Sequence, residues 1–107
     1  MGKTERFDYH QIDELLHSRI RLAVVSVLAR CDEAEFTWIR DTVGTTDGNL
    51  TTHYRKLEEA GYITVDKRFI DRKPATFLRL TDAGRMALIA YARHLADLIS
   101  LEGEKKE

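Results

Sequence analysis

The side chains that could do chemistry in this chain gather between Thr46 and Gly61. Leu50, Tyr54 and Leu57 recur at helical spacing and predict a helix with one buried stripe. The opposite side carries short donors and acceptors followed by cations: Gly48, Thr51, Thr52 and Arg55, flanked by Asn49 and Lys56. On a helix, such side chains can reach base edges and phosphates in the major groove of DNA. The same face would also suit solvent on an ordinary core helix, so the neighbouring elements must decide.

The residues before this helix predict a second helix and a tight turn. In chain order, the signals are a cap at Thr37, a helix from Trp38 to Val43 ended by Gly44, a cap at Thr46 or Asp47, and Gly61 as the left-handed end of the second helix. Residues 37–61 therefore have the pattern of a helix-turn-helix.

After this pattern the hydrophobic period changes from helical to alternating. Strands are predicted over Tyr62–Phe69 and Thr76–Leu80. The turn between them, residues 70–75, contains the only proline of the chain. Lys67, Arg68, Arg72 and Lys73 make this hairpin basic. A helix-turn-helix followed by a two-stranded hairpin is a winged helix, with residues 62–80 as the wing.

This arrangement predicts which side chains contact DNA. Arg55 could bind guanine with two hydrogen bonds, whereas Asn49 and Lys56 are expected on phosphates, which position the protein without specifying sequence. The predicted DNA-binding residues are Asp47, Gly48, Asn49, Thr51, Thr52, His53, Arg55, Lys56, Arg68, Arg72 and Lys73.

Three further helices are expected around these elements. They are a short N-terminal helix within residues 8–16, from Tyr9 to Leu16 with Asp8 as its cap, a core helix from a Ser18 cap to Arg30, and a last helix within residues 81–101, capped by Thr81 or Asp82. Glu35 to Thr37 is too short for more than a single strand rung. The fold class expected is α+β, mainly α with a small β-hairpin, as one winged helix-turn-helix domain over residues 1–107.

The last helix is apolar on more than one face, which is more than packing on a small domain requires. We therefore expect a homodimer that pairs through its terminal helices. The predicted interface residues are Ile12, Leu15, Leu88, Tyr91, Leu95 and Leu98.

Composition and charge limit the classes of function. The chain has 107 residues, 43% of them hydrophobic and 33% charged, which indicates one globular domain. Its net charge is −1, but residues 44–79 hold seven cations and five anions, a local charge of +2. One cysteine, no apolar signal region and no run long enough to cross a membrane suggest a cytoplasmic protein with no membrane partner. Neither a metal-ligand cluster nor a catalytic motif is evident, so we expect no cofactor, no metal and no enzyme activity.

The order of these signals resembles the compact winged-helix transcription regulators of the MarR and ArsR kind. The resemblance rests on Phe36–Ile39, Thr46–His53, Leu57–Ile63 and Leu80–Arg85, with His17–Leu22 similar to the start of the first core helix of that family. It implies a homodimer on a pseudo-palindromic site, with one helix of each subunit in a major groove and a wing along the backbone or minor groove. Two departures are Tyr54, where such proteins often have an aliphatic residue, and a short wing.

Two other functions fit the same sequence. The winged helix could bind another protein, in which case its affinity would not fall steeply with salt as DNA affinity does. Alternatively, the chain could be a sensor, with a small-molecule effector in the dimer cleft beside the last helix or with Cys31 as a redox group.

Overall fold

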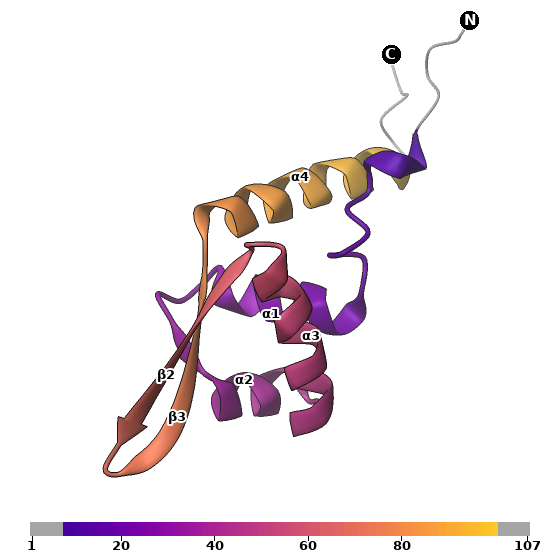
Figure 1. The fold of residues 1–107 in the computed structure, drawn as a ribbon. Helices are drawn as coiled ribbons and strands as arrows, with labels where there is room; N and C mark the ends of the chain where they lie inside the picture. The colour runs from indigo at the N-terminus through magenta and orange to yellow at the C-terminus, as the bar shows by residue number, and fades with distance from the viewer. Residues whose placement is uncertain (1–7, 101–107) are drawn as a thin grey trace, which may run out of the picture.

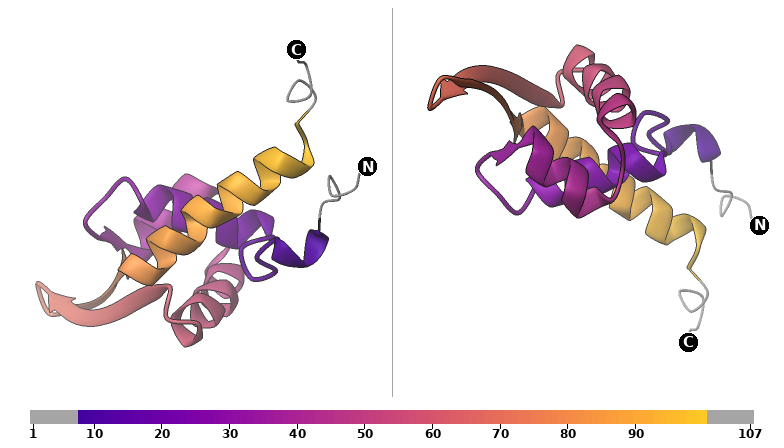
Figure 2. Two further views of the ribbon diagram at one scale, coloured as in Figure 1. Left: turned by 90° about the horizontal axis from the view of Figure 1, so that it is seen from above. Right: turned by 90° about the horizontal axis from the view of Figure 1, so that it is seen from below.

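The computed structural model of the protein describes residues 8–100. In chain order the elements are η1 (Tyr9–Gln11), α1 (Arg19–Leu28), β1 (Ala34–Glu35), α2 (Phe36–Val43), α3 (Asp47–Glu59), β2 (Ile63–Ile70), β3 (Lys73–Leu80) and α4 (Asp82–Leu98). The α4 helix covers one end of the molecule, α2 and α3 lie at the other end, and α1 runs between them (Figure 1). The β2–β3 hairpin projects beside α2, at the end away from η1 (Figures 1 and 2). The fold is α+β, as the sequence predicted.

Three of the four α-helices begin at side-chain caps that the sequence identified. Ser18, Thr46 and Thr81 each accept a hydrogen bond from the backbone amide three residues further on, at 3.4, 3.2 and 3.0 Å. Gly44 and Gly61 have φ of 81° and 79°, the left-handed conformation that ends a helix. These predictions are confirmed.

The cap predicted at Thr37 is wrong. The helix α2 begins at Phe36, and Glu35 occupies its N-cap position without a side-chain hydrogen bond. The reason is that Glu35 is paired with Phe77 in the sheet, so β1 leads directly into the helix and Thr37 falls inside the first turn.

The N-terminal helix predicted over residues 9–16 is also wrong. Asp8 does accept a hydrogen bond from the His10 amide at 3.0 Å, but η1 is a 3-10 helix of three residues. The Asp13 carboxylate then accepts hydrogen bonds from the Leu16 amide at 3.1 Å and from the Tyr62 hydroxyl at 2.6 Å. These bonds compete with a continuing helix and fix residues 13–17 as a turn that buries Leu16 completely. The hydrogen bond to Asp13, followed by burial, raises the pKa of Tyr62 to about 12.

The second strand of the wing is longer than predicted, and the turn is tighter. Both strands have eight residues, and only Asp71 and Arg72 separate them, with φ of 53° and 68°. Two consecutive left-handed residues are typical of the type I′ turn, whose twist matches that of a hairpin. Pro74 therefore lies in β3 and not in a loop. The sheet order is β1-β3-β2, but β1 pairs only with Phe77 and Leu78, so no strand lies beside Pro74 on that side.

The core lies where α1, α2 and α3 meet the inner part of the sheet. Its fully buried side chains are Leu16, Val24, Val25, Leu28, Ile39, Leu50, Leu57, Ile63 and Leu78. Burying one such side chain contributes about 1.5–3 kcal/mol. Tyr54 is buried too, edge-on to Phe36 with ring centroids 6.0 Å apart, so the aromatic residue in the expected aliphatic position fills core space. The predicted stripe of α3 is confirmed.

The start of α4 fits closely against the inner end of the wing. A Cβ atom added at Gly84 would lie 2.2 Å from the Tyr62 carbonyl oxygen and 2.7 Å from Leu80 Cδ1. Thr81 ties the same region together, because its hydroxyl donates a hydrogen bond to the Gly61 carbonyl at 2.6 Å. The angle between α4 and the wing is therefore fixed by backbone contact.

Candidate DNA-binding surface

The outer face of α3 is polar and open. While Leu50, Tyr54 and Leu57 point into the core, the opposite side leaves Gly48, Asn49, Thr52, Arg55 and Lys56 exposed and Thr51 half-buried. Thr52 and Arg55 are three residues apart, so they are neighbours on the helix surface. Within residues 8–100, the side chains of Arg55 and Lys56 make no hydrogen bond or ion pair. They are cations available to an external partner.

Asp47 stands at the start of α3, but its carboxylate is already engaged. Arg40 of α2 donates hydrogen bonds to Asp47 at 2.8 Å and to Asp41 at 2.8 Å. These two bonds, with Asp41 the stronger, raise the pKa of Arg40. Asp47 therefore links the two helices of the helix-turn-helix and fixes where α3 begins.

His53 is turned away from the open face of α3 toward α1. Arg21 donates from Nη1 to His53 Nδ1 at 2.8 Å, and its Nε donates to the Leu15 carbonyl at 2.6 Å. Because arginine has no acceptor, His53 Nδ1 carries the lone pair. Burial, followed by the charges of Arg21 and Lys56, lowers the pKa of His53. The neutral imidazole thus helps to hold α3 against α1.

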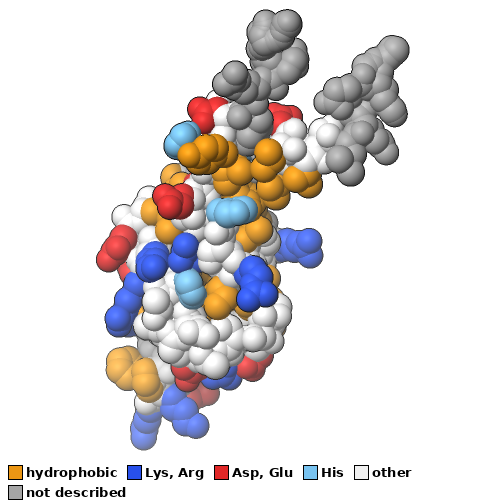
Figure 3. Space-filling model, turned by 90° about the vertical axis from the view of Figure 1, so that its right-hand side faces the viewer, with side chains coloured by type: hydrophobic (Ala, Val, Ile, Leu, Met, Phe, Trp, Pro, Cys, Tyr) orange, Lys and Arg blue, Asp and Glu red, His pale blue; other side chains and the backbone are white. Residues whose placement is uncertain are grey.

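The wing tip carries the second group of free cations. Arg72 and Lys73 are exposed at the turn, and Lys67 is exposed further along β2. Within the described residues, none of the three makes an ion pair. Figure 3 shows Lys and Arg side chains beside an exposed hydrophobic patch at the lower end of the molecule, where the wing lies. Lys67 belongs to the free cations, although it was not among the predicted contacts.

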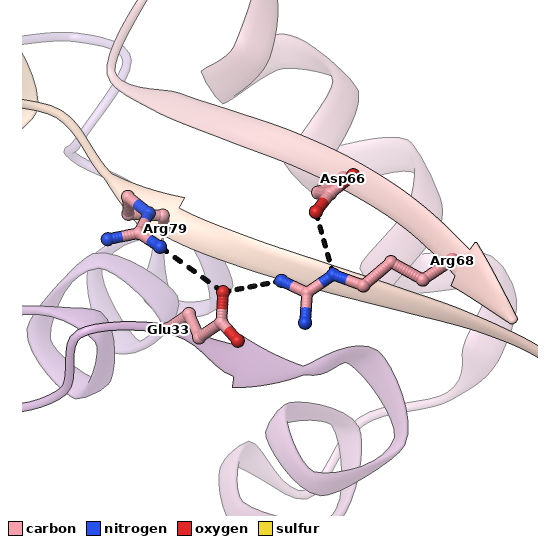
Figure 4. Close-up of polar contacts among 4 residues, drawn as sticks. All are labelled: Glu33, Asp66, Arg68 and Arg79. Atoms are coloured by element: carbon pink, nitrogen blue, oxygen red, sulfur yellow. Dashed lines mark hydrogen bonds and ion pairs between the residues drawn. The ribbon is translucent and has the colours of Figure 1, made fainter. Parts of the chain in front are cut away.

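Arg68 is placed differently from the cations at the tip. Its Nη2 donates to Glu33 at 2.6 Å, and its Nε donates to Asp66 at 2.7 Å (Figure 4). Its guanidinium carbon lies 3.9 Å above the centre of the Phe77 ring. Arg79 also donates to Glu33, at 3.3 Å. The hydrogen bond to Glu33, then that to Asp66, raises the pKa of Arg68. We call Glu33, Asp66, Arg68, Phe77 and Arg79 the wing clamp.

The wing clamp joins the loop before β1 to both wing strands. The Arg68 hydrogen bond also holds the pKa of the Glu33 carboxyl below its ordinary value. Sequence reasoning missed Glu33, because 35 residues separate it from Arg68 and no local pattern pairs them. The strand register, which sets Asp66 opposite Phe77, could have suggested the rest of the cluster.

The predicted dimer residues lie at the other end of the molecule. Tyr91 is only 5% exposed within its own chain and shares a hydrogen bond of 2.9 Å with His17. Leu88 and Leu95, together with Ile12 and Leu15, are half-buried against the same core. Leu98 is 45% exposed, and three further apolar residues at α4 that were not predicted, Met86, Ile89 and Ile99, are exposed as well. Sequence periodicity could not separate the two groups, because both continue one apolar helix.

A groove runs between α1 and α4 beside these residues. It has a volume of about 350 Å³ and is lined mainly by apolar side chains, among them Leu22, Leu88, Tyr91, Leu95 and Ile99. Over residues 8–100, no group of three potential metal ligands is present. Nor is any helix in that range long and apolar enough to cross a membrane.

The fold and the open α3 face together define a winged helix-turn-helix protein. The winged helix DNA-binding domain family matches residues 20–99, and the chain belongs to this family. A transcriptional regulator homologue from Pyrococcus horikoshii, whose structure is solved, is 30% identical, with a TM-score of 0.76 over 81% of this chain and 86% of that chain. An uncharacterized protein of Methanocaldococcus jannaschii is 29% identical over 85 residues, 79% of this chain and 92% of that protein.

The fold is also that of a repressor solved on DNA. The transcriptional repressor CouR, bound to a 23-mer duplex, has a TM-score of 0.63 at 21% identity, covering 89% of this chain and 77% of that chain. The resemblance to winged-helix regulators found in the sequence is thereby confirmed. DNA binding in transcription regulation is the function of this chain, because its family and its fold are those of DNA-binding regulators.

Proposed function

We propose that the chain is a sequence-specific, homodimeric transcription regulator of the cytoplasm, with α3 in the major groove and the wing on the adjoining DNA. The observation that carries this proposal is the pair of unpaired cations on α3, Arg55 and Lys56, on a face that is otherwise short and polar. A helix with this face can approach base edges without breaking an ion pair of Arg55 or Lys56.

Each residue of the surface has a proposed role. Arg55 reads a guanine, Thr51 and Thr52 contact bases or phosphates, and Asn49 and Lys56 bind phosphates. Gly48, with nothing within 4 Å of its Cβ position, lets the first turn of α3 come close to DNA. Arg72 and Lys73 neutralise phosphates at the wing tip. Asp47, His53 and Arg68 act indirectly, by holding α3 and the wing in place.

The dimer would form through the exposed apolar residues of α4. Met86, Ile89, Leu98 and Ile99 are 66%, 42%, 45% and 60% exposed, which is a costly surface for an isolated chain. The groove between α1 and α4 continues this apolar surface. A partner helix over both would place two copies of α3 on successive turns of one face of the DNA.

A small-molecule effector is a second proposal, and the same groove supports it. Its volume of about 350 Å³ and its apolar lining suit a compact apolar compound. A redox role for Cys31 has less support, because its Sγ donates a hydrogen bond to the Val27 carbonyl at 3.4 Å and the side chain is half-buried.

The decisive experiment is selection of bound duplexes from a random pool, followed by titrations with two variants. Arg55→Ala should lose roughly 1–3 kcal/mol of discrimination at one base pair. Arg72→Ala should weaken binding to all duplexes and reduce the slope of log affinity against log salt by about 1. Arg30→Ala, after the end of α1, removes the same charge from an exposed position outside α3, the wing and α4, and is the matched control. Unchanged affinity and preference in both test variants would contradict the proposed surface, and a monomer in light scattering would contradict the dimer.

A further inference from the structure

The outer part of the wing is apolar as well as basic. Phe69 is 75% exposed and Ile70 is 48% exposed. Phe69 pairs with Pro74 across the hairpin, so the ring and the proline are adjacent on one face. Isolated exposed hydrophobic side chains are common, but Phe69 and Pro74 are adjacent at the end of a projection and form a contiguous patch, whereas Ile70 points to the opposite face of β2.

Cations surround this patch. Lys67 lies two residues before Phe69 and so shares its face of the strand, and Arg72 and Lys73 follow at the turn. The only acidic residue from 67 to 75 is Asp71. A partner of the wing tip must therefore offer apolar surface between two sources of negative charge.

The wing holds the tip in a defined direction. A turn of two left-handed residues joins the strands directly, and the wing clamp ties their inner part to the loop before β1 (Figure 4). The tip projects at the end of the molecule that carries α2 and the start of α3, opposite α4 (Figure 1). The patch is thus available to the DNA that α3 engages.

We propose that the wing tip is a minor-groove wedge, in which Phe69 inserts between base steps and bends the duplex while Arg72 and Lys73 bind the phosphates on either side. The minor groove offers apolar sugar walls between two phosphate backbones, which matches the chemistry of the tip. Phenylalanine and proline are among the side chains that proteins wedge between base steps there. The ring has no charge to lose on entering the groove. This inference rests on the proposed function, because α3 must first bring the wing to DNA.

The wedge makes an asymmetric prediction about affinity and shape. Removing the ring should reduce the bend and weaken binding several-fold, yet leave the salt slope unchanged, since no cation is lost. Removing Arg72 should lower the salt slope and keep the bend. The two properties of the tip can therefore be separated by single substitutions.

The test is the DNA bend angle, measured by energy transfer between dyes at the ends of a selected duplex, with wild type and three variants. Phe69→Ala should lose most of the bend, whereas Phe69→Leu, which keeps an apolar wedge, should retain it. Ile70→Ala, on the other face of β2, is the matched control and should bend DNA as wild type does. Thermal unfolding checks that each variant is folded. We expect all three to be folded, because the substituted side chains are exposed.

Three results would overturn the proposal, and only one of them would also contradict the proposed function. If wild type binds duplex DNA with a steep salt dependence but Phe69→Ala bends it equally, the wedge is wrong and the proposed function stands. If wild type binds no duplex at low salt, the proposed function fails and the wedge with it. Loss of the bend in Phe69→Leu as well as Phe69→Ala would also contradict an apolar wedge.

Discussion

The inner and outer parts of the wing are built from the same two strands, but their arginine and phenylalanine side chains differ in whether they have partners within the chain. In the inner part, Arg68 is paired with two carboxylates and packed on an aromatic ring. In the outer part, Arg72 has no such partner and Phe69 has no cover. The comparison shows that the cations of one basic hairpin can be either paired within the chain or free. Its inner cations hold the wing in place, and its outer cations are free to bind.

The largest effect is expected from a change that breaks the inner part. In Gly84→Ala, the new methyl group would meet the Tyr62 carbonyl at 2.2 Å, so α4 and the wing must separate. We expect a loss of roughly 3 kcal/mol in the free energy of unfolding, measured by urea denaturation.

Gly48→Ala is the control for that substitution. Nothing lies within 4 Å of its Cβ position, and alanine is the better helix former by about 1 kcal/mol, so stability should hold or rise. Equal stability of the two variants would show that the inner end of the wing is not closely packed.

An intermediate effect tests whether Arg68 holds the wing or binds DNA itself. If it belongs to the wing clamp, Glu33→Gln and Arg68→Lys should both weaken DNA binding several-fold, because each removes a charged hydrogen bond that orients the wing. The salt slope should stay the same in both variants.

The opposite pattern would identify Arg68 as a direct contact. Glu33→Gln would then strengthen binding by releasing the guanidinium. Arg68→Ala would lower the salt slope by about 1, as Arg72→Ala is expected to do.

The smallest effect extends the comparison to α3, where His53 is engaged and Arg55 is free. Since the pKa of His53 is lowered in the folded protein, the unfolded chain binds its proton more readily. The stability contributed by the neutral ring is therefore fully present above the ordinary histidine pKa of 6.5, and it is lost as the pH falls from that value through the lower pKa of the folded protein. Thermal midpoints at about pH 7.5 and about pH 5.5 should differ more in wild type than in His53→Gln, which keeps an acceptor for Arg21.

Local signals predicted the elements that position the surface. Helix caps at Ser18, Thr46 and Thr81 depend on a residue and the amides just after it, so their outcome could be foreseen from sequence. The apolar stripe of α3 likewise follows from spacing within one helix. The order of these local signals along the chain, two helices followed by a hairpin, distinguished a winged helix from an ordinary core helix.

Most of what the sequence did not reveal involves partners that are distant in the chain. Residues 13–17 form a turn because Asp13 bonds Tyr62, 49 residues away. Arg68 is hydrogen-bonded to Glu33, 35 residues away, and Tyr91 packs into its own chain through contacts with α1 and His17; local spacing could not reveal either contact. The turn of the hairpin was predicted too long for a local reason. Two left-handed residues of the types Asp and Arg are uncommon in such a turn, and Pro74 suggested a loop, so the sequence did not indicate that β3 begins at Lys73.

Pro74 has a consequence for how the protein behaves at high concentration. Hydrogen-bonded and open pairs alternate outward along β3, and β1 covers only its inner part. The backbone beyond Phe77 could therefore template the strand of a second molecule, but Pro74 has no amide hydrogen to offer there. On this edge of the sheet, Pro74 therefore disfavours the addition of a strand from a second molecule.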